Sequence, residues 1–321
     1  MTITINRRTL LLTSASAALA ASALPSFAQD KPILAFVTNA SADFWTIARR
    51  GTEKAQAELP DFQVEFIVPG ESTPAEQRRI VDDLLARGVA GVAISPINAE
   101  SATETLNKIA AAGVLFTSDS DAPESNRMVY IGTDNVAAGV QAGELMKEAM
   151  PEGGDAMLFV GTMDNANARE RVEGIRTALE GSNINIVDVR TDEIDFVKAR
   201  RNVEDTLTAY PEIDMLVGLY SYNPPQIIEA VAAAGMTGKV KIIGFDEDVV
   251  TLRGIKEGAV YGTIVQQPFE FGYQSIIGMA KVIGGDASWI PENKLSIVPT
   301  KVINAANVEE FEGMMREMLA N

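Results

Sequence analysis

The chain of 321 residues contains no cysteine and no histidine. Disulfide bonds, thiolate chemistry and metal sites built on Cys or His ligands are therefore excluded, and we expect neither a metal nor a cofactor. Basic residues are also scarce, with 27 Lys and Arg against 44 Asp and Glu, a net charge of −17. Such a chain repels nucleic acid and anionic membranes, so we expect neither as a partner. The absence of cysteine fits an oxidising compartment.

The N-terminal apolar stretch is too short and too rich in Ala and Ser to span a membrane. It follows Arg7 and Arg8 and ends in small residues before Gln29, which is typical of an export signal. The string RRTLL is similar to a twin-arginine signal, and an ordinary secretory signal with two arginines is the alternative. We expect residues 1–28 to be removed. Because there is no cysteine to lipidate, we expect a soluble periplasmic protein without a lipid anchor.

A strand–helix alternation runs through the rest of the chain and occurs twice. The first round has strands at 33–38, 64–68, 90–94 and 114–118 and helices at 44–58, 74–87 and 99–112. The second round has strands at 156–160, 184–189, 214–219 and 240–245 and helices at 166–180, 195–209 and 223–234. Apolar strands separated by helices predict parallel sheets covered on both faces, so the fold class is α/β with two lobes. The segments 260–266, 269–282 and 307–319 must complete one half or the other.

Polar and aromatic residues follow equivalent strands in the two halves. Asp119 and Asp246 come directly after the fourth strand of each half, and the strings TNASADFW, GTMDNANARER, SPIN and YSYN follow other strands. In open α/β sheets, ligands bind beyond the carboxyl ends of the strands. If the two lobes face each other there, one cleft collects these side chains. An Asp after a strand is also often a helix N-cap, which is an alternative for Asp119. Asp121 and Asp248 are interpreted as caps or solvated residues.

Two of these stretches allow a structural and a functional interpretation. Phe44 and Trp45 are either core residues at a helix start or the walls of a binding site. In the string ARERVEG, Arg171 and Glu173 are interpreted as part of an amphipathic, salt-bridged helix face. The symmetry between the halves favours a binding role for Arg169, as it does for the two strand-end carboxylates.

The same residues carry a family resemblance. The strings FVTNASADFWTIARRG, GTDNVAAGVQAG, NARERVEG, IIGFDED and GTIVQQP occur in the order and spacing of the ribose/galactose-type periplasmic sugar-binding proteins of ABC importers, the type I periplasmic binding proteins. The chain resembles this family over nearly all of its length after residue 28. The resemblance implies two Rossmann-like lobes, each with a parallel sheet flanked by helices, joined by a three-strand hinge. The implied lobes are 32–133 with 267–292, and 134–266 with 293–321.

The resemblance also implies where the chain crosses between lobes and what the site residues do. The crossings are expected near Thr133–Asn135, near Gln266 and near Pro291–Lys294. The aromatic pair would stack on the ligand, the strand-end carboxylates would accept hydrogen bonds from hydroxyls, and Arg169 would donate. Asn135 and Gln266 would bond at the hinge side, and Phe245 would wall the pocket. The expected ligand-binding residues are Phe44, Trp45, Asp119, Ser120, Asn135, Arg169, Tyr220, Tyr222, Asn223, Phe245, Asp246 and Gln266.

The sequence departs from the ribose-binding pattern at three positions. Ser120 stands where an arginine usually follows the fourth-strand aspartate, and Ala42 where an asparagine precedes the aromatic pair. Tyr220 stands where ribose binders have an asparagine, and Trp45 adds further bulk. Fewer donors and more filled space argue against ribose. We expect a small polyol or another compact, pentose-sized sugar.

The resulting functional prediction is a monomeric periplasmic substrate-binding protein that delivers its ligand to the permease and ATPase subunits of an ABC importer. The alternatives are a binder of a non-sugar polar ligand and a chemoreceptor-linked sensor. An enzyme is disfavoured, because no Gly-x-Ser-x-Gly elbow occurs and the string GMTGKV lacks the Ser or Thr of a phosphate loop. A repressor of the same fold would need an N-terminal DNA-binding helix pair and a basic face; here the expected export signal stands in that place and the charge is −17, so we do not expect a repressor.

Overall fold

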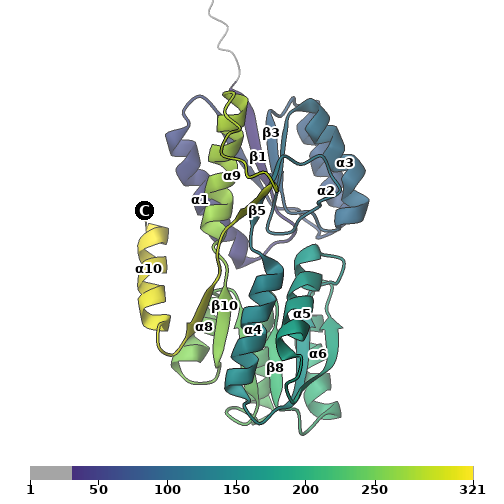
Figure 1. Ribbon diagram of the computed structural model, residues 1–321, viewed down its shortest axis with the longest axis vertical. Coiled ribbons are helices and arrows are strands. Elements are labelled where there is room, and N and C mark those ends of the chain that lie inside the picture. Colours follow the sequence, from purple (N-terminus) through teal and green to yellow (C-terminus); the bar gives the residue numbers. More distant parts are fainter. Residues whose placement is uncertain (1–30, 321) are drawn as a thin grey trace, which may run out of the picture. The chain divides into compact units, whose positions relative to one another are not determined.

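The computed structural model describes residues 31–320, and the chain from Pro32 onward forms one compact unit. The expected export signal, residues 1–28, lies outside the described residues. The described part contains two six-stranded sheets, each flanked by helices (Figure 1). None of its helices combines the length and apolar character that crossing a membrane requires.

The first sheet has the strand order β11-β5-β4-β3-β1-β2, and all its pairings are parallel. Its strands are β1 (Ile33–Val37), β2 (Gln63–Ile67), β3 (Gly91–Ile94), β4 (Val114–Ser118), β5 (Val129–Gly132) and β11 (Leu295–Ile297). Its helices are α1 (Asp43–Glu58), α2 (Pro74–Ala86), α3 (Ala99–Ala112) and α9 (Pro268–Ile283). Helices α1 and α9 pack side by side on one face, and α2 and α3 pack together on the other (Figure 1).

The second sheet has the order β12-β10-β9-β8-β6-β7, and only its edge strand β12 pairs antiparallel. Its strands are β6 (Gly154–Val160), β7 (Ile184–Thr191), β8 (Met215–Gly218), β9 (Lys241–Phe245), β10 (Gly262–Val265) and β12 (Lys301–Asn304). Its helices are α4 (Asn135–Ala149), α5 (Ala166–Leu179), α6 (Phe196–Ala209), α7 (Asn223–Ala233), α8 (Val249–Lys256) and α10 (Val308–Ala320). Helices α4 and α5 form one closely packed pair (Figure 1).

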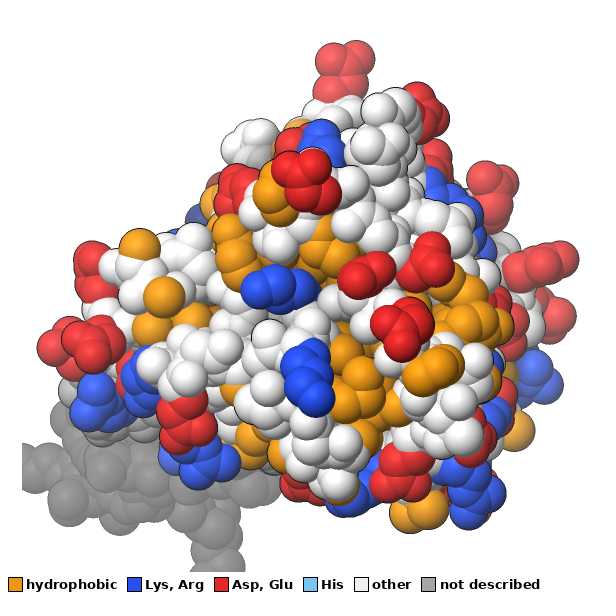
Figure 2. Space-filling view, turned by 90° about the horizontal axis from the view of Figure 1, so that it is seen from below, with side chains coloured by type: hydrophobic (Ala, Val, Ile, Leu, Met, Phe, Trp, Pro, Cys, Tyr) orange, Lys and Arg blue, Asp and Glu red, His pale blue; other side chains and the backbone are white. Residues whose placement is uncertain are grey.

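The central strands are buried on both faces because helices cover each sheet on both sides. All residues of β4 and β8 are buried, which explains why their sequences VLFTS and MLVG do not alternate between apolar and charged residues. Most charged residues lie on the surface. Figure 2 shows one such face, where acidic and basic side chains are interspersed around apolar ones. The acidic excess of the chain therefore does not make this face uniformly negative.

In its described part, the chain passes from one sheet to the other three times. It does so between β5 and α4, between β10 and α9, and between β11 and β12. The third crossing differs from the expectation near Pro291–Lys294, because Leu295 pairs with Tyr130 in the first sheet. Residues 293–297, expected in the second lobe, therefore belong with the first. Pro299, which has no N–H to donate, separates the two short strands on either side of the actual crossing. The rest of the lobe division stays a prediction.

Candidate functional site

A cavity lies where the carboxyl ends of strands from both sheets meet. Its empty volume, including the open mouth, is about 450 Å³. The lining side chains come from the segments after β1, β4, β6, β7, β8, β9 and β10, as expected for an open α/β sheet. They are Asn39, Ala40, Ala42, Phe44, Trp45, Asp119, Asn165, Asn167, Arg171, Ile194, Tyr220, Ser221, Tyr222, Asp246 and Gln266.

Asp119 is the buried carboxylate that the first lobe contributes, with only 4% of its surface exposed. Its Oδ2 accepts hydrogen bonds from Ser95 Oγ at 2.8 Å, Asn39 Nδ2 at 3.3 Å and Asn167 Nδ2 at 3.4 Å. The last of these crosses between the lobes. Its Oδ1 accepts no hydrogen bond from the described residues. Burial raises the pKa of Asp119, and the nearby Arg171 and the three donors oppose that rise. The side chain is not a helix cap, and one oxygen is left for a ligand.

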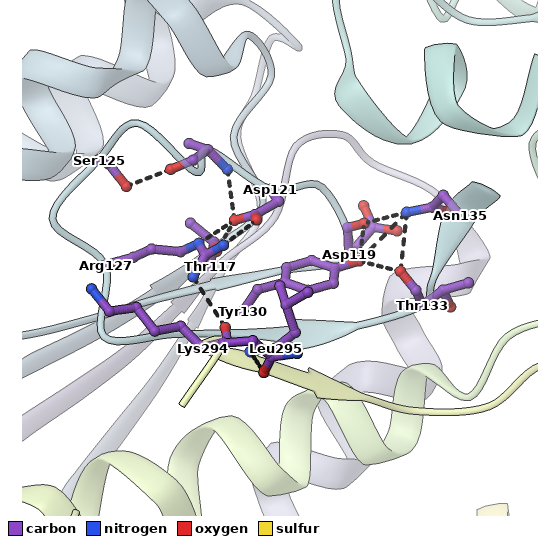
Figure 3. A network of polar contacts seen from close by, with 12 residues as sticks. Thr117, Asp119, Asp121, Ser125, Arg127, Tyr130, Thr133, Asn135, Lys294 and Leu295 are labelled. Atoms are coloured by element: carbon purple, nitrogen blue, oxygen red, sulfur yellow. Dashed lines mark hydrogen bonds and ion pairs between the residues drawn. The ribbon is translucent and has the colours of Figure 1, made fainter. Parts of the chain in front are cut away.

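A polar network holds the backbone of Asp119 in place (Figure 3). Asp119 has a φ of 64°, in the left-handed region that few non-glycine residues adopt. Its carbonyl oxygen lies 3.0 Å from the hydroxyl of Tyr130, which is also 2.8 Å from the carbonyl oxygen of Thr133 at the first crossing. Asn135 Nδ2 approaches the same two carbonyl groups at 3.5 and 3.3 Å. The strand-end turn that carries the carboxylate is therefore tied to the crossing between lobes.

Asp121, two residues further on, belongs to the structural part of the same network. Its carboxylate pairs with Arg127 at 2.5 Å and accepts a hydrogen bond from Thr117 Oγ1 (Figure 3). Arg127 Nη1 in turn donates to the carbonyl oxygen of Lys294, just before β11. The interpretation of Asp121 as a cap or solvated residue is therefore wrong, because a buried arginine needs a counter-charge. The interpretation of Asp248 as a cap or solvated residue is confirmed, since it caps α8.

Asp246 is the counterpart of Asp119 in the second lobe, again 4% exposed and with a φ of 67°. Its Oδ1 accepts a hydrogen bond from Gln266 Nε2 at 2.9 Å, and its carbonyl oxygen accepts one from Thr263 Oγ1 at 2.8 Å. Burial raises the pKa of Asp246 to about 6, against the opposing effects of Arg171 and Gln266. At neutral pH its carboxylate is therefore an ionised hydrogen-bond acceptor that faces the cavity.

Arg171 is the cation of the cavity, so its interpretation as part of an amphipathic, salt-bridged helix face is wrong. It is 1% exposed, its Nη1 donates to the carbonyl oxygen of Leu219 at 2.6 Å, and its Nε donates to Asn135 Oδ1 at 3.0 Å. Its Nη2 has no partner among the described residues. The guanidinium group stacks over the ring of Phe245 at 4.6 Å. A buried guanidinium with an unused donor is ready to bind an oxygen of a ligand.

Arg169, which we expect to donate a hydrogen bond to the ligand, does not line the cavity. It is exposed, and its Nη1 bonds the carbonyl oxygens of Met163 and Asp164, both at 2.7 Å. Two residues apart in a helix lie about 200° around its axis, so Arg169 and Arg171 cannot both face the cavity. The assignment of the donor role to Arg169 is therefore wrong.

Aromatic side chains from both lobes line the cavity. Phe44 and Trp45 lie at the start of α1 with their rings edge to face at 4.9 Å, and Trp45 Nε1 donates to Asn39 Oδ1 at 3.2 Å. From the second lobe, the hydroxyl of Tyr220 donates to Asn167 Oδ1 at 3.0 Å. Tyr222 lines the cavity beside Tyr220, with ring centroids 6.2 Å apart. The two interpretations of the first-lobe pair are compatible, because both side chains also pack in the core.

Besides Arg169, four expected ligand-binding residues do not line the cavity. Ser120 is fully buried, and its hydroxyl has no hydrogen-bond partner within residues 31–320. Phe245 lies beneath the guanidinium of Arg171, and Asn135 and Asn223 bond other side chains of the site rather than the open space. In each case the side chain supports a neighbour that lines the cavity or is buried in the core.

Several lining residues were not singled out from the sequence. Asn39, Asn165 and Asn167 lie in the strand-end strings TNASADFW and GTMDNANARER, so their position was a usable signal. Arg171 could have been found from the apolar stripe of its helix. Ile194 follows an edge strand, and nothing in its chemistry indicates a binding site. In the described residues, no cluster of three or more acidic side chains is arranged to hold a metal ion.

Comparison with known proteins agrees with this geometry. The model of the periplasmic binding protein domain matches residues 33–287. The ribose import binding protein of Haemophilus influenzae is 26% identical over 263 residues, which cover 81% of this chain and 87% of that protein. The corresponding protein of Escherichia coli is 24% identical, with 86% and 93% covered.

Solved structures agree as well. An ABC transporter solute binding protein from Burkholderia graminis in complex with D-arabinose has a TM-score of 0.81 at 27% identity, with 86% of this chain and 96% of that chain covered. A glucose-galactose binding protein from Geobacillus stearothermophilus has a TM-score of 0.81 at 26% identity, with 87% and 99% covered. The predicted fold class is confirmed: two lobes with mainly parallel sheets flanked by helices. The chain belongs to the periplasmic binding protein family.

Proposed function

We propose that this protein captures a small sugar or polyol in the cavity between its lobes and delivers it to the permease of an ABC importer. The observation that carries the proposal is the pair Asp119 and Asp246, which present buried carboxylates to one cavity from equivalent strand ends. A carboxylate oxygen is a good acceptor for a hydroxyl group, and a hydrogen bond to a charged group contributes about 1.5–3 kcal/mol. A ligand with several hydroxyl groups satisfies both carboxylates at once.

The remaining side chains complement the rest of such a ligand. The free Nη2 of Arg171 can donate to a ring or hydroxyl oxygen. The rings of Phe44 and Trp45 offer apolar surface to the C–H faces of a sugar. Relatives are named for ribose and allose, and similar solved structures are a complex with D-arabinose and a glucose-galactose binding protein, which supports a sugar or a related polyol as the ligand class.

The same reasoning extends to partners and location. A protein of this family with an export signal would act in the periplasm, as a monomer, together with the permease and ATPase subunits. It would bind without chemical turnover, because the cavity offers acceptors and donors but neither an activated nucleophile nor a metal-binding cluster among the described residues. A non-sugar polar ligand, or a role in supplying a chemoreceptor, is the alternative.

A ligand screen tests the proposal. Purified protein without the export signal is titrated calorimetrically with pentoses, hexoses and polyols, and each compound is afterwards recovered and analysed. We expect at least one compound to bind with a single site and to be recovered unchanged. A variant with both Asp119→Asn and Asp246→Asn should lose that binding while its unfolding transition stays cooperative. Binding of amino acids or other non-hydroxylated compounds alone, or recovery of a converted product, would overturn the proposal.

A further inference from the structure

Asp192 is a buried carboxylate behind the side chains that the second lobe contributes to the cavity, and it does not line the cavity. Asp192 follows β7 and is 1% exposed. Its Oδ1 accepts hydrogen bonds from the hydroxyl of Tyr222 at 2.6 Å and from the backbone N–H of Ile194 at 2.9 Å. Its Oδ2 accepts one from Asn223 Nδ2 at 3.0 Å. Both oxygens of this acid are thus used by protein donors, and two of the donors belong to residues that line the cavity.

The segment that follows Asp192 is strained. Glu193 and Ile194 have φ values of 54° and 63°, so two consecutive non-glycine residues lie in the left-handed region. For the β-branched isoleucine this conformation is an outlier, and such strain persists only where surrounding contacts enforce it. The hydrogen bond from the N–H of Ile194 to the carboxylate is one such contact. It fixes the turn that places the isoleucine side chain at the cavity.

Three side chains form what we name the second-lobe wall: Ile194, Tyr220 and Tyr222. They converge on Gly161, where an added Cβ would lie 3.0 Å from Ile194, 2.7 Å from Tyr220 and 2.9 Å from Tyr222. The wall therefore packs too closely to admit even a methyl group there. Asn223 also anchors Tyr220, the third residue of the wall. The Oδ1 of Asn223 accepts a hydrogen bond from the backbone N–H of Tyr220 at 3.0 Å.

We propose that Asp192 is the positioning residue that fixes the second-lobe wall and thereby makes the cavity select ligands by size. The proposal rests on the proposed function, a sugar or polyol in this cavity. If the wall is held at a fixed place, a ligand that carries one more hydroxymethyl group on this side meets Ile194 or the tyrosines. If the wall can move, the smaller ligand loses contacts and the larger one is tolerated.

The charge state of Asp192 is compatible with this role. Burial raises its pKa to about 6, and the hydrogen bonds from Tyr222, Ile194 and Asn223 oppose that rise. At neutral pH the group is therefore an ionised carboxylate, which accepts all three hydrogen bonds. An amide in its place cannot do so. Its NH₂ group would face either the NH₂ group of Asn223 or the two donors on the other oxygen.

This donor–acceptor mismatch provides the test, because it can be repaired. Asp192→Asn breaks the network, and the double variant Asp192→Asn/Asn223→Asp restores it with the amide and the carboxylate exchanged. In the double variant, the amide oxygen accepts from Tyr222 and Ile194, its NH₂ donates to the new carboxylate, and that carboxylate still accepts from the N–H of Tyr220. Asp195→Asn is the matched control, since this residue lies in the same loop and caps α6, and asparagine caps equally well.

The first measurement needs no ligand. Amide hydrogen exchange of residues 192–196 and 220–223 is followed in the four proteins. We expect exchange to be about tenfold faster in Asp192→Asn, and wild-type rates in the double variant and in the control. Unchanged exchange in Asp192→Asn would show that the carboxylate does not hold the wall, which overturns the proposal.

The second measurement addresses size selection. Each protein is titrated with pairs that share a configuration and differ by one carbon unit: D-ribose and D-allose, D-xylose and D-glucose, D-arabinose and L-galactose, xylitol and sorbitol. For the pair that the wild type binds, we expect the affinity ratio to shrink by about tenfold in Asp192→Asn and to recover in the double variant. An unchanged ratio despite faster exchange would mean that the anchoring is only structural and would overturn the proposal.

Failure of the proposed function is distinguishable from failure of this inference. If the wild type binds no sugar or polyol, the proposed function falls and size selection falls with it. In that case the exchange measurement still decides whether Asp192 anchors the wall. If the wild type binds both members of a pair equally, the wall does not select by size, and the inference fails while the proposed function stands.

Discussion

Asp119 and Asp246 occupy equivalent positions after β4 and β9, and both have a left-handed backbone, with φ values of 64° and 67°. A left-handed residue after a strand turns its side chain away from the direction that the strand would impose. Hydroxyl groups of Tyr130 and Thr263 hold the two carbonyl oxygens at 3.0 and 2.8 Å. The two lobes thus use the same backbone device to aim a carboxylate at a shared cavity.

Removing the charge of either carboxylate should weaken ligand binding. Asp119→Asn and Asp246→Asn should each cost roughly 1.5–3 kcal/mol, which is about ten- to a hundredfold in dissociation constant. Calorimetric titration measures this directly. Asp248→Asn is the matched control, because it caps α8 and asparagine keeps that cap, so its affinity should stay within about twofold of the wild type. Equal losses in all three variants would show that the charge of the region, not the site, matters.

The two arginines of α5 should behave differently. Arg171→Lys keeps the charge but loses the fork of donors that reaches Leu219, Asn135 and the cavity, so we expect affinity to fall by about tenfold or more. Arg169→Lys changes an exposed side chain and should leave affinity within about twofold. Thermal unfolding of both variants separates a loss of fold from a loss of binding. A larger effect at Arg169 would refute the placement of Arg171 as the cation of the cavity.

Trp45 should report ligand binding by fluorescence. The chain has two tryptophans, and only Trp45 lines the cavity; Trp289 packs against Phe116 in the first lobe. We therefore expect ligand to change the emission of the wild type and of Trp289→Phe, and not that of Trp45→Phe. Trp45→Phe should also weaken binding, because the indole N–H that positions Asn39 is lost. A response that survives in Trp45→Phe would place the ligand elsewhere.

Asp121→Asn should reduce stability rather than affinity. The substitution removes the counter-charge of Arg127, whose side chain is only 6% exposed. Breaking a buried ion pair costs on the order of 3 kcal/mol of stability. Denaturant unfolding should show a lower midpoint. Ligand affinity below the unfolding transition should be close to that of the wild type, because neither residue lines the cavity. A variant as stable as the wild type would contradict the structural role of this pair.

The ligand-free protein should lose stability as the pH rises from about 4 to about 6. The pKa values of Asp192 and Asp246 are raised by burial to about 6 in the folded chain, against 3.8 as the ordinary value. The folded state therefore holds their protons more tightly than the unfolded state, and this contribution is present in acid and lost as the pH passes the folded value. Unfolding free energies at several pH values should show the decline, with a shallower slope in Asp246→Asn.

The sequence predicted most of this architecture. The strand and helix order of both halves, and the strand-end positions of Asp119 and Asp246, follow from apolar runs that end in polar residues. The strands β5 and β12 and the helices α4 and α8 were not assigned as elements. The three-residue strand β11 was missed because so short a segment has no readable period, and its pairing with β5 depends on residues more than 160 positions away.

Side-chain directions were predicted less well. Arg171 lies in the apolar stripe of α5 with Ala168, Val172 and Ile175, so the spacing of the stripe indicated a buried position, but its charge suggested a solvated one. The roles of Asp121, Asp192 and Asn223 could not be predicted, because each depends on one specific partner brought close by the fold. Local pattern determines the element, and tertiary contact determines what a polar side chain does.

Gln266 belongs both to the cavity lining and to a segment where the chain crosses between sheets. A ligand that contacts Gln266 therefore contacts a crossing between the lobes as well as the walls of the cavity. If the crossings adopt the binding-competent arrangement in only a fraction of the molecules, the apparent dissociation constant of every ligand is multiplied by the same factor. Substitutions at the remote crossing, such as Pro299→Gly, should rescale all ligands together and leave their ranking unchanged. The ranking of ligands and the overall affinity are therefore separately adjustable in this protein. The walls of the cavity determine the ranking, and the crossings between the lobes determine the overall affinity.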